Sequence, residues 1–597
     1  MSDDAAPERD GFHHPASEAE IVALVQRARR AGLQLRVRGA AHSVSHAIYA
    51  DAADGSDADE PPNRVGMQAP PPGPNLNLML DRHNGWRVRD AARRLVEADA
   101  GIHLGLDPSD PTGAGALQRS LLWQLWRERG WTLFDTGGVT HQTVSGFTAT
   151  GSSGGSLQFS ANRNLFGFRF VDGRGELHEV TREDADLDRF HAMCPNLGLL
   201  GVVTAVLFEC VEAFEIAGSE ATTTLADCPV DLFGDGDDAR GRPSLERWLR
   251  ETPFGRLEWW PQRGVERVLT WKAARIDPQA GFQPRPYRRF GDDDPEAAQH
   301  LIGILFAIIG NLGDMSAAKP KLEDDFDALR GTLELLGAAD LGAVGKLLAR
   351  ALATAIEVGV DAAITLLEPV APLLERELPD LYPRLVDLFI PLDADRGGAG
   401  RGRPQTFQDW SWHGLPMDNA ASDVLIPTEF TEAWIPLGRA REVMVLLRDW
   451  FAAPQDDGAA LRRAGTYAWE LYAAMPERFW LNPSYSDGSD EWRDGALRID
   501  PYWYADNAAD PVDTLFAGLW HLLRDAGIPF RLHWGKFQPR RPPGDRTWVD
   551  FFAAQYPRWD DFLALRAEHD PDGIFLTGYW RDRLGLWDAP RPVPHER

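Results

Sequence analysis

The first part of the chain places its most chemically suggestive residues in a strand-turn-histidine segment, Arg36 to Ser43. Leu33 to Val37 alternates apolar with polar or basic side chains, which predicts a β-strand. The turn after it, Gly39-Ala40-Ala41, has small residues whose backbone N–H groups form a concavity suited to a phosphate. His42 follows at the rim of this concavity. Such a segment alone is more often structural, so its meaning depends on the rest of the chain.

Two further small-residue segments could bring a ligand close to the backbone. Glycine and hydroxyl residues recur from Thr136 to Ser156. Another small-residue segment, Asn196 to Gly201, precedes a predicted strand, Val202 to Val211. A flexible linker has a similar composition. Val144 and Phe147 interrupt the first segment, however, and predicted strands flank it. We therefore expect both segments to be folded and to allow the close approach of a flat ligand or of another backbone.

The elements that must position these segments can be read from periodicity. A helix is predicted over Glu18 to Ala31, because apolar residues recur at helical spacing after the capping pair Ser17 and Glu20. Residues 51–74 are acidic and rich in Pro and Gly, which predicts an exposed loop. Further segments are assigned by the same rules: a helix over 117–129, a hairpin over 164–180, helices over much of 292–392, a loop over 394–403, and strands at 75–80, 94–99, 430–435, 466–474 and 496–503.

Composition excludes several classes of protein. The 597 residues carry a net charge of -28, which would repel nucleic acid and anionic lipid. Cys194, Cys210 and Cys228 have no metal-ligand or disulfide spacing, and we expect them to be buried thiols. No metal site is predicted, because no cluster of carboxylates and histidines has ligand spacing. Without a signal peptide or a membrane-spanning segment in the sequence, the expected location is the cytoplasm.

In their order and spacing, these segments resemble the flavoprotein oxidases of the vanillyl-alcohol oxidase superfamily, and most of all its aldonolactone and alditol oxidase branch. The resemblance covers roughly residues 12–212 and 425–585. It is carried by the histidine turn at 38–43, the strands at 77–80 and 97–101, the glycine-rich segment at 143–151, Gly198-Leu199-Leu200-Gly201-Val202-Val203, His533-Trp534-Gly535-Lys536, and Asp570-Pro571-Asp572-Gly573-Ile574-Phe575-Leu576. The predicted helical insertion has no counterpart in the family.

The resemblance implies an α+β fold with a two-subdomain FAD-binding domain of the PCMH type. That domain is expected over 11–213, and 540–597 is expected to return to it. A cap domain with an antiparallel sheet is expected over 214–539, interrupted by the helical insertion at about 292–392. The implied FAD contacts are Arg38, Gly39, Ala40, Ala41, His42, Ser43, Gly137, Thr143, Ser145, Gly146, Thr150, Gly151, Ser153, Gly154, Gly198, Gly201 and Val202. His42 stands where the branch often bonds its histidine covalently to the flavin, whereas His103 and His141 are expected to be structural.

The expected catalytic residues lie on the cap strands, where this chain departs from the family. The branch usually has Glu-x-Arg in one cap strand, but this chain has Glu470 and Tyr472. Side chains alternate along a strand, so these two share one face. Arg498 on the next predicted strand is hypothesised to restore the missing cation. The loop histidine of the family is also absent, because Thr150-Gly151 is followed by Ser152-Ser153-Gly154.

The chemistry of flavin reduction suggests a role for several of these side chains. Reduced flavin is anionic, so a fixed cation favours reduction, and Lys536 is the predicted cation facing the flavin or the substrate. Glu470 and Tyr472 are predicted to orient or deprotonate a substrate hydroxyl. His533 has two open readings, as a site residue or as a core histidine.

The resulting hypothesis is an FAD-dependent oxidase that acts on a CH–OH group of an aldonolactone, a polyol or another alcohol, with O2 as the acceptor. A same-fold dehydrogenase that uses an electron carrier is an alternative. The many tryptophans and the apolar insertion also suit a sterol or an aromatic alcohol. A flavin-binding protein with a decayed active site is a further alternative.

Overall fold

The structure is a computed structural model. It describes residues 6–52, 69–262, 264–277, 279–287, 300, 303–304, 306–308, 310–311, 314–328, 342–372, 386, 390–392, 404–417, 428–453, 466–505, 510–540 and 544–594. The predicted loop at 394–403 and most of the loop at 51–74 lie outside these residues. Within the described part of the chain, no helix is both long and apolar enough to cross a bilayer. All three cysteines are buried free thiols, as predicted.

The first body of the molecule is built on a five-stranded antiparallel sheet with the order β3-β4-β8-β6-β7. Its strands are β3 (Trp86–Asp90), β4 (Leu95–Asp99), β6 (Leu165–Val171), β7 (Leu177–Thr181) and β8 (Val202–Glu209). Beside it, β1 (Leu35–Arg38) pairs in parallel with β2 (Leu76–Met79). Helix α1 (Glu18–Ala31) begins at Ser17, whose side chain accepts from the Glu20 amide, as the capping pair predicts.

The second body is a larger sheet of nine strands, with all pairings antiparallel. The order is β15-β10-β14-β13-β18-β19-β17-β20, and β16 also pairs with β19. These strands are β10 (Glu215–Thr224), β13 (Phe254–Trp260), β14 (Arg267–Ile276), β15 (Gln405–Trp410), β16 (Thr428–Phe430), β17 (Ala433–Pro436), β18 (Thr466–Ala474), β19 (Ala496–Tyr504) and β20 (Arg531–Leu532). An antiparallel sheet is thus present in this part of the chain, as predicted.

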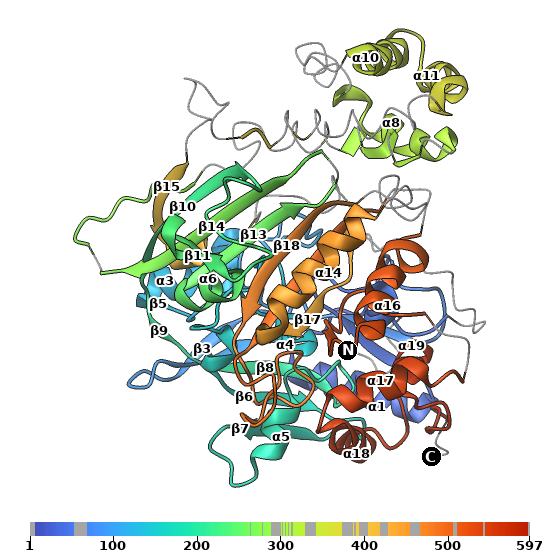
Figure 1. Cartoon of the computed structure of the whole chain (residues 1–597). Helices are drawn as coiled ribbons and strands as arrows, with labels where there is room; N and C mark the ends of the chain where they lie inside the picture. Colours follow the sequence, from blue (N-terminus) through green and yellow to red (C-terminus); the bar gives the residue numbers. More distant parts are fainter. Residues whose placement is uncertain are drawn as a thin grey trace.

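The two faces of this sheet differ: one packs against a helix, and the other faces a cavity. Helix α14 (Ala440–Ala452) lies across β18 in Figure 1, and its buried Val443, Met444 and Leu447 belong to the same apolar core as Trp469 and Leu471 of the strand. Because neighbouring side chains point to opposite faces, Glu470 and Tyr472 are turned the other way. The core therefore fixes which side chains face the cavity described below.

Three described helices of the insertion lie together above the strand ends of the nine-stranded sheet in Figure 1: α8 (Lys319–Asp324), α10 (Gly342–Glu357) and α11 (Val360–Leu367). Their buried apolar residues form a separate cluster that includes Tyr504 at the end of β19. The Tyr504 hydroxyl donates to the Gly303 carbonyl at 3.1 Å. The insertion thus buries a core of its own, as expected, and is anchored to the sheet.

Two predicted elements are wrong in detail. The helix over 117–129 is divided at Ser120, because the amides of Leu121 and Leu122 bond to the carbonyls of His103 and Leu104. The strand over 430–435 is two strands, β16 and β17. Between them, Thr431 donates its hydroxyl to the Phe537 carbonyl, and the Glu432 carbonyl accepts from the His533 amide. Both breaks are made by partners far away in the sequence.

Candidate functional site

One cavity of about 560 Å³ joins the predicted cofactor segments to the inner face of the nine-stranded sheet. From the predicted cofactor set, these residues line it: Gly39, Ala40, Ala41, His42, Ser43, Ser145, Gly146, Thr150, Ser153, Gly198, Gly201 and Val202. Arg38, Gly137, Thr143, Gly151 and Gly154 do not line it. All four predicted catalytic residues, Glu470, Tyr472, Arg498 and Lys536, are in its wall.

The histidine turn has the shape that its small residues predict. Ala41 has a φ of 59°, in the left-handed region. A Cβ on Gly39 would come within 2.7 Å of Thr143 Oγ1, so only glycine fits between the turn and the segment that starts α4 (Val144–Thr150). Among the described residues, no acceptor takes the amide protons of Ala40, Ala41 or Ser43. These amides are available to an anionic group in the cavity.

Arg36 holds the loops around the cavity together, a role that the sequence did not reveal. Its guanidinium donates to the carbonyls of Gly198 and Leu197 at 3.0 Å each, to Phe575 at 3.1 Å and to Ala47. Burial lowers the pKa of Arg36 to about 10, which still leaves it charged at neutral pH. One side chain of β1 therefore ties the third small-residue turn to the C-terminal segment.

His42 lies beside a second histidine. His141 Nδ1 is 3.2 Å from His42 Nε2, and their ring centroids are 5.1 Å apart. His141, which was expected to be structural, is almost fully buried and lines the cavity. Lys536 Nζ donates to the His42 carbonyl at 2.7 Å and lies 3.8 Å from the ring centroid of Phe430. The predicted cation thus sits at the histidine turn.

These features fit FAD. The unpaired amides of the histidine turn suit its phosphates, and the glycine contacts let two loops approach a flat ring system. Gln142 adds an acceptor to the cavity wall, because its buried Oε1 has no hydrogen-bond partner within the described part of the chain. The parts of the cavity wall that carry these features are within residues 39–43, 138–153 and 196–203.

Arg498 is at the centre of a buried network. Nε donates to Glu432 Oε1 at 2.7 Å, and the two NH groups donate to the Ser153 carbonyl at 2.7 Å and to the Tyr472 hydroxyl at 2.6 Å. Burial opposes the charge on Glu432, but the Arg498 cation outweighs it, so the pKa of Glu432 is lowered. Arg498 thus links β19 to the glycine-rich loop by hydrogen bonds. Its N–H groups go to the protein, which argues against the hypothesis that it replaces a substrate-facing arginine.

Asp500 is the cavity residue with the clearest acid-base character, and sequence reasoning did not select it as a site residue. It pairs in register with Glu470 across β18 and β19. Burial, together with the carboxylate of Glu432, raises the pKa of Asp500 well above its usual value. Tyr472 donates its hydroxyl to Asp500 Oδ2 at 2.7 Å, whereas Oδ1 has no partner within the described part of the chain. A proton can therefore be held at Oδ1 next to the cavity.

His533 and Glu470 complete the polar wall. The Gly535 amide donates to His533 Nδ1 at 3.1 Å, and burial lowers the pKa of His533 to about 4. The ring is therefore neutral and carries its proton on Nε2, so it is a donor. Tyr502 donates its hydroxyl to Glu470 Oε2 at 2.5 Å. The wall offers both donors and acceptors to one hydroxyl group.

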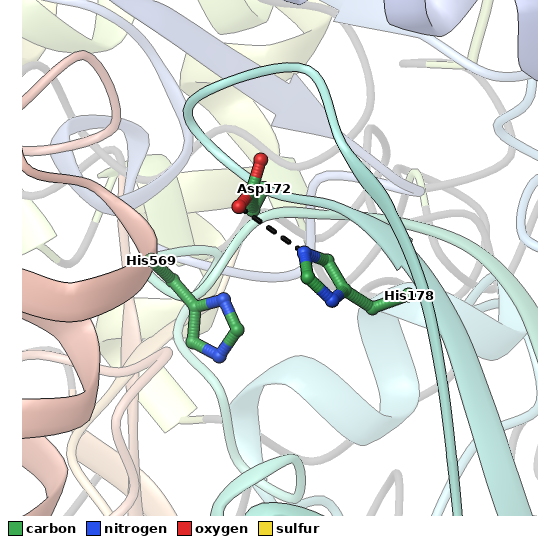
Figure 2. A group of neighbouring side chains, drawn as sticks. All are labelled: Asp172, His178 and His569. Atoms are coloured by element: carbon green, nitrogen blue, oxygen red, sulfur yellow. Dashed lines mark hydrogen bonds and ion pairs between the residues drawn. The ribbon is translucent and has the colours of Figure 1, made fainter.

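A cluster outside this cavity unites residues that are far apart in the sequence. Asp172, His178 and His569 come from the β6–β7 hairpin and the end of α18 (Trp559–His569), and they offer ligand atoms within 4.8 Å of one another. Sequence spacing could not indicate this cluster, because its members come from two distant segments. Figure 2 shows the His569 ring turned toward the Asp172–His178 pair, whose Nε2 to Oδ2 distance is 3.1 Å.

Its contacts describe a hydrogen-bonded joint. Asp172 Oδ1 accepts from the amides of Arg174 and Glu176 at 2.9 Å each. The Arg174 guanidinium lies 3.5 Å from Oδ2, so a cation already faces the carboxylate. Burial lowers the pKa of His569 to about 4, which leaves this ring neutral. The Gly173 amide donates to the His569 carbonyl at 2.9 Å, and this backbone hydrogen bond attaches the end of α18 to the hairpin.

No family model matches the chain. It is 26% identical over 273 residues to a D-arabinono-1,4-lactone oxidase of Eremothecium gossypii, covering 45% of this chain and 41% of that protein. An L-gulono-1,4-lactone dehydrogenase of Mycobacterium tuberculosis is 26% identical over 38% of this chain and 43% of its own length. A long-chain alcohol oxidase of an uncultured marine euryarchaeote is 26% identical over 34% of each chain. Less than half of each curated relative is matched.

In fold, the chain is similar to the crystal structure of a cholesterol oxidase from B. sterolicum, with a TM-score of 0.59 and 14% identity over 96% of this chain and 93% of that one. The two proteins share a mixed fold of helices and antiparallel sheets. The sequence relatives and this fold together confirm the resemblance of the chain to the vanillyl-alcohol oxidase superfamily and to its aldonolactone oxidase branch.

Proposed function

We propose that the protein is an FAD-dependent oxidoreductase that oxidises a CH–OH group, with O2 as the electron acceptor and H2O2 as the second product. The observation that carries this proposal is one cavity whose wall includes both the turns predicted to bind the cofactor and the buried acid-base residues of β18 and β19. The names of the sequence relatives, lactone oxidases, a lactone dehydrogenase and an alcohol oxidase, support the same reaction class.

When bound, FAD supplies the redox chemistry by accepting a hydride from the carbinol carbon. The side chains of the cavity wall handle the hydroxyl group. The ionised form of Asp500 accepts the hydroxyl proton at Oδ1, and the raised pKa of this group makes that form a stronger base than an ordinary carboxylate. His533 Nε2–H donates to the substrate oxygen and fixes its direction. Arg498 donates a hydrogen bond to the Tyr472 hydroxyl, which donates to Asp500, and these bonds orient both side chains.

The same cavity supports proposals about the cofactor and the electron acceptor. His42 is proposed to be bonded covalently to FAD, with His141 as a positioning residue at 3.2 Å. Lys536 is proposed to stabilise the reduced cofactor electrostatically from its place at the histidine turn. A dehydrogenase that passes electrons to a carrier is the second candidate, and the name of the M. tuberculosis relative favours it.

Anaerobic mixing of the holoprotein with alcohols tests the reaction class. Bleaching of the flavin absorbance by an alcohol is the expected result, and Asp500→Asn is expected to slow it by roughly 10²–10⁴-fold, the usual contribution of a general base. Asp409→Asn is the matched control, because Asp409 is buried on β15, bonds to His413 and does not line the cavity. Equal rates for the two variants would contradict the role of Asp500. Peroxide formation in air separates the oxidase from the dehydrogenase.

A further inference from the structure

We infer that the substrate is an alcohol with one reactive hydroxyl and a large apolar body, and that the helical insertion supplies part of the wall that binds this body. The inference rests on the proposed function and narrows it. It separates this chain from enzymes for polyols and sugar lactones, whose substrates carry an oxygen on nearly every carbon.

The face of the nine-stranded sheet that lines the cavity changes from polar to apolar along its strands. Successive side chains on this face are two residues apart. Nearest the glycine-rich loop, Arg256, Tyr472 and Arg498 stand opposite one another on β13, β18 and β19. The next row is Glu258, Glu470 and Asp500. Two residues further along these strands are Trp260, Ala468 and Tyr502, and all nine residues line the cavity. The polar rows thus face the cofactor end, and the wall becomes apolar away from it.

The insertion continues the apolar end of this wall. Phe306, Val386 and Ile390 line the cavity. Val386 and Ile390 pack in one apolar cluster with Trp260, Ala468 and Leu269 of the sheet. This cluster is separate from the core of the insertion itself. The insertion therefore does more than bury its own residues.

Specific contacts fix these wall residues in place. The Phe306 ring stacks on Tyr504 of β19, with centroids 5.7 Å apart and planes 26° apart. Arg267 of β14, which is almost fully buried, donates to the Ile390 carbonyl. A built apolar surface is consequently present at the end of the cavity that lies away from the cofactor.

The chemistry of this surface selects against polyols. A hydroxyl group moved from water onto Ala468, Val386 and Ile390 would lose its hydrogen bonds, because these side chains have no hydrogen-bonding group. A methylene group placed there gains from the removal of apolar area from water. Each added methylene is expected to raise kcat/KM about fourfold until the chain outgrows the wall.

A matched substrate series tests the inference with the holoprotein. Straight-chain primary alcohols from butan-1-ol to decan-1-ol, a sterol, sorbitol and a galactonolactone are compared by anaerobic flavin bleaching and by equilibrium binding, read from tryptophan fluorescence. Rising kcat/KM and tighter binding with chain length or with the sterol are expected. A preference for sorbitol or the lactone would overturn the inference and leave the proposed function intact.

A pair of variants assigns the effect to the insertion. Ile390→Ser is expected to lower the ratio of kcat/KM for decan-1-ol over butan-1-ol by roughly tenfold, and to weaken decan-1-ol binding similarly. Val358→Ser is the control, since Val358 belongs to the insertion but is 73% exposed and does not line the cavity. Equal ratios in both variants would overturn the inference. If no alcohol bleaches the flavin while decan-1-ol still binds in an Ile390-dependent way, the proposed function fails and the apolar site stands.

Discussion

Replacing Arg498 by methionine is expected to cause a large loss of stability, because it leaves Glu432 without its cation. Both side chains are almost fully buried, with 4% and 3% of their side-chain surface exposed. Removing one member of a buried ion pair costs about 3–5 kcal/mol, since the remaining charge has been taken out of water without compensation. The carbonyl of Ser153 and the hydroxyl of Tyr472 lose a donor in addition.

A second substitution separates the part of the stability loss that is due to charge from the part that is due to packing. The double variant Arg498→Met, Glu432→Gln carries no buried charge at this point, so it is expected to regain at least half of the lost free energy of unfolding. Urea denaturation at pH 7 measures both variants, and binding of FAD to each reports whether the loop at Ser153 and Gly154 has loosened. A single variant within about 1 kcal/mol of the unmodified protein, or a double variant no more stable than the single one, would refute this reasoning.

Three further predictions follow from individual histidines and from the joint. His42→Ala is expected to lose any yellow colour that stays with acid-precipitated protein, and a precipitate that keeps its colour would contradict a bond to His42. The pKa of His533 is about 4 when folded and about 6.5 when unfolded, so unfolding takes up a proton between these values. Stability is therefore expected to fall by about 3 kcal/mol as the pH drops from 6.5 to 4, and His533→Gln should reduce this slope in urea titrations. A chelator is expected to leave the thermal midpoint unchanged, whereas Asp172→Ala should lower it, because Asp172 holds the hairpin by hydrogen bonds.

Local patterns were sufficient to predict the parts of the site that lie on single elements. Alternation along 466–474 and 496–503 predicted which side chains of β18 and β19 share a face, and Glu470, Tyr472 and Arg498 do face one cavity. The small residues of 39–43 predicted a turn with available amides. These features depend on a few neighbouring residues, which the sequence displays directly.

Features that arise from pairing between distant elements could not be predicted in this way. Asp500 acquires its raised pKa from burial and from Glu432, which lies between β16 and β17. His141 and His42 are brought together although they are 99 positions apart. The hydrogen-bond partners of Arg498 could not be predicted for the same reason, since Ser153 and Glu432 come from two other segments. Single-sequence periodicity carries no information on such contacts.

The attachment of the C-terminal segment to the histidine turn has a consequence for biosynthesis. The amide of Leu35 donates to the Ile574 carbonyl, Arg36 donates to Phe575, and the Trp580 indole donates to Ala47. A ribosome makes the turn more than 500 residues before these partners. The histidine turn therefore cannot acquire these contacts until residues 574–580 have been synthesised. Until then the turn depends on neighbouring strands alone, which makes slow translation a period of exposure to proteases and chaperones.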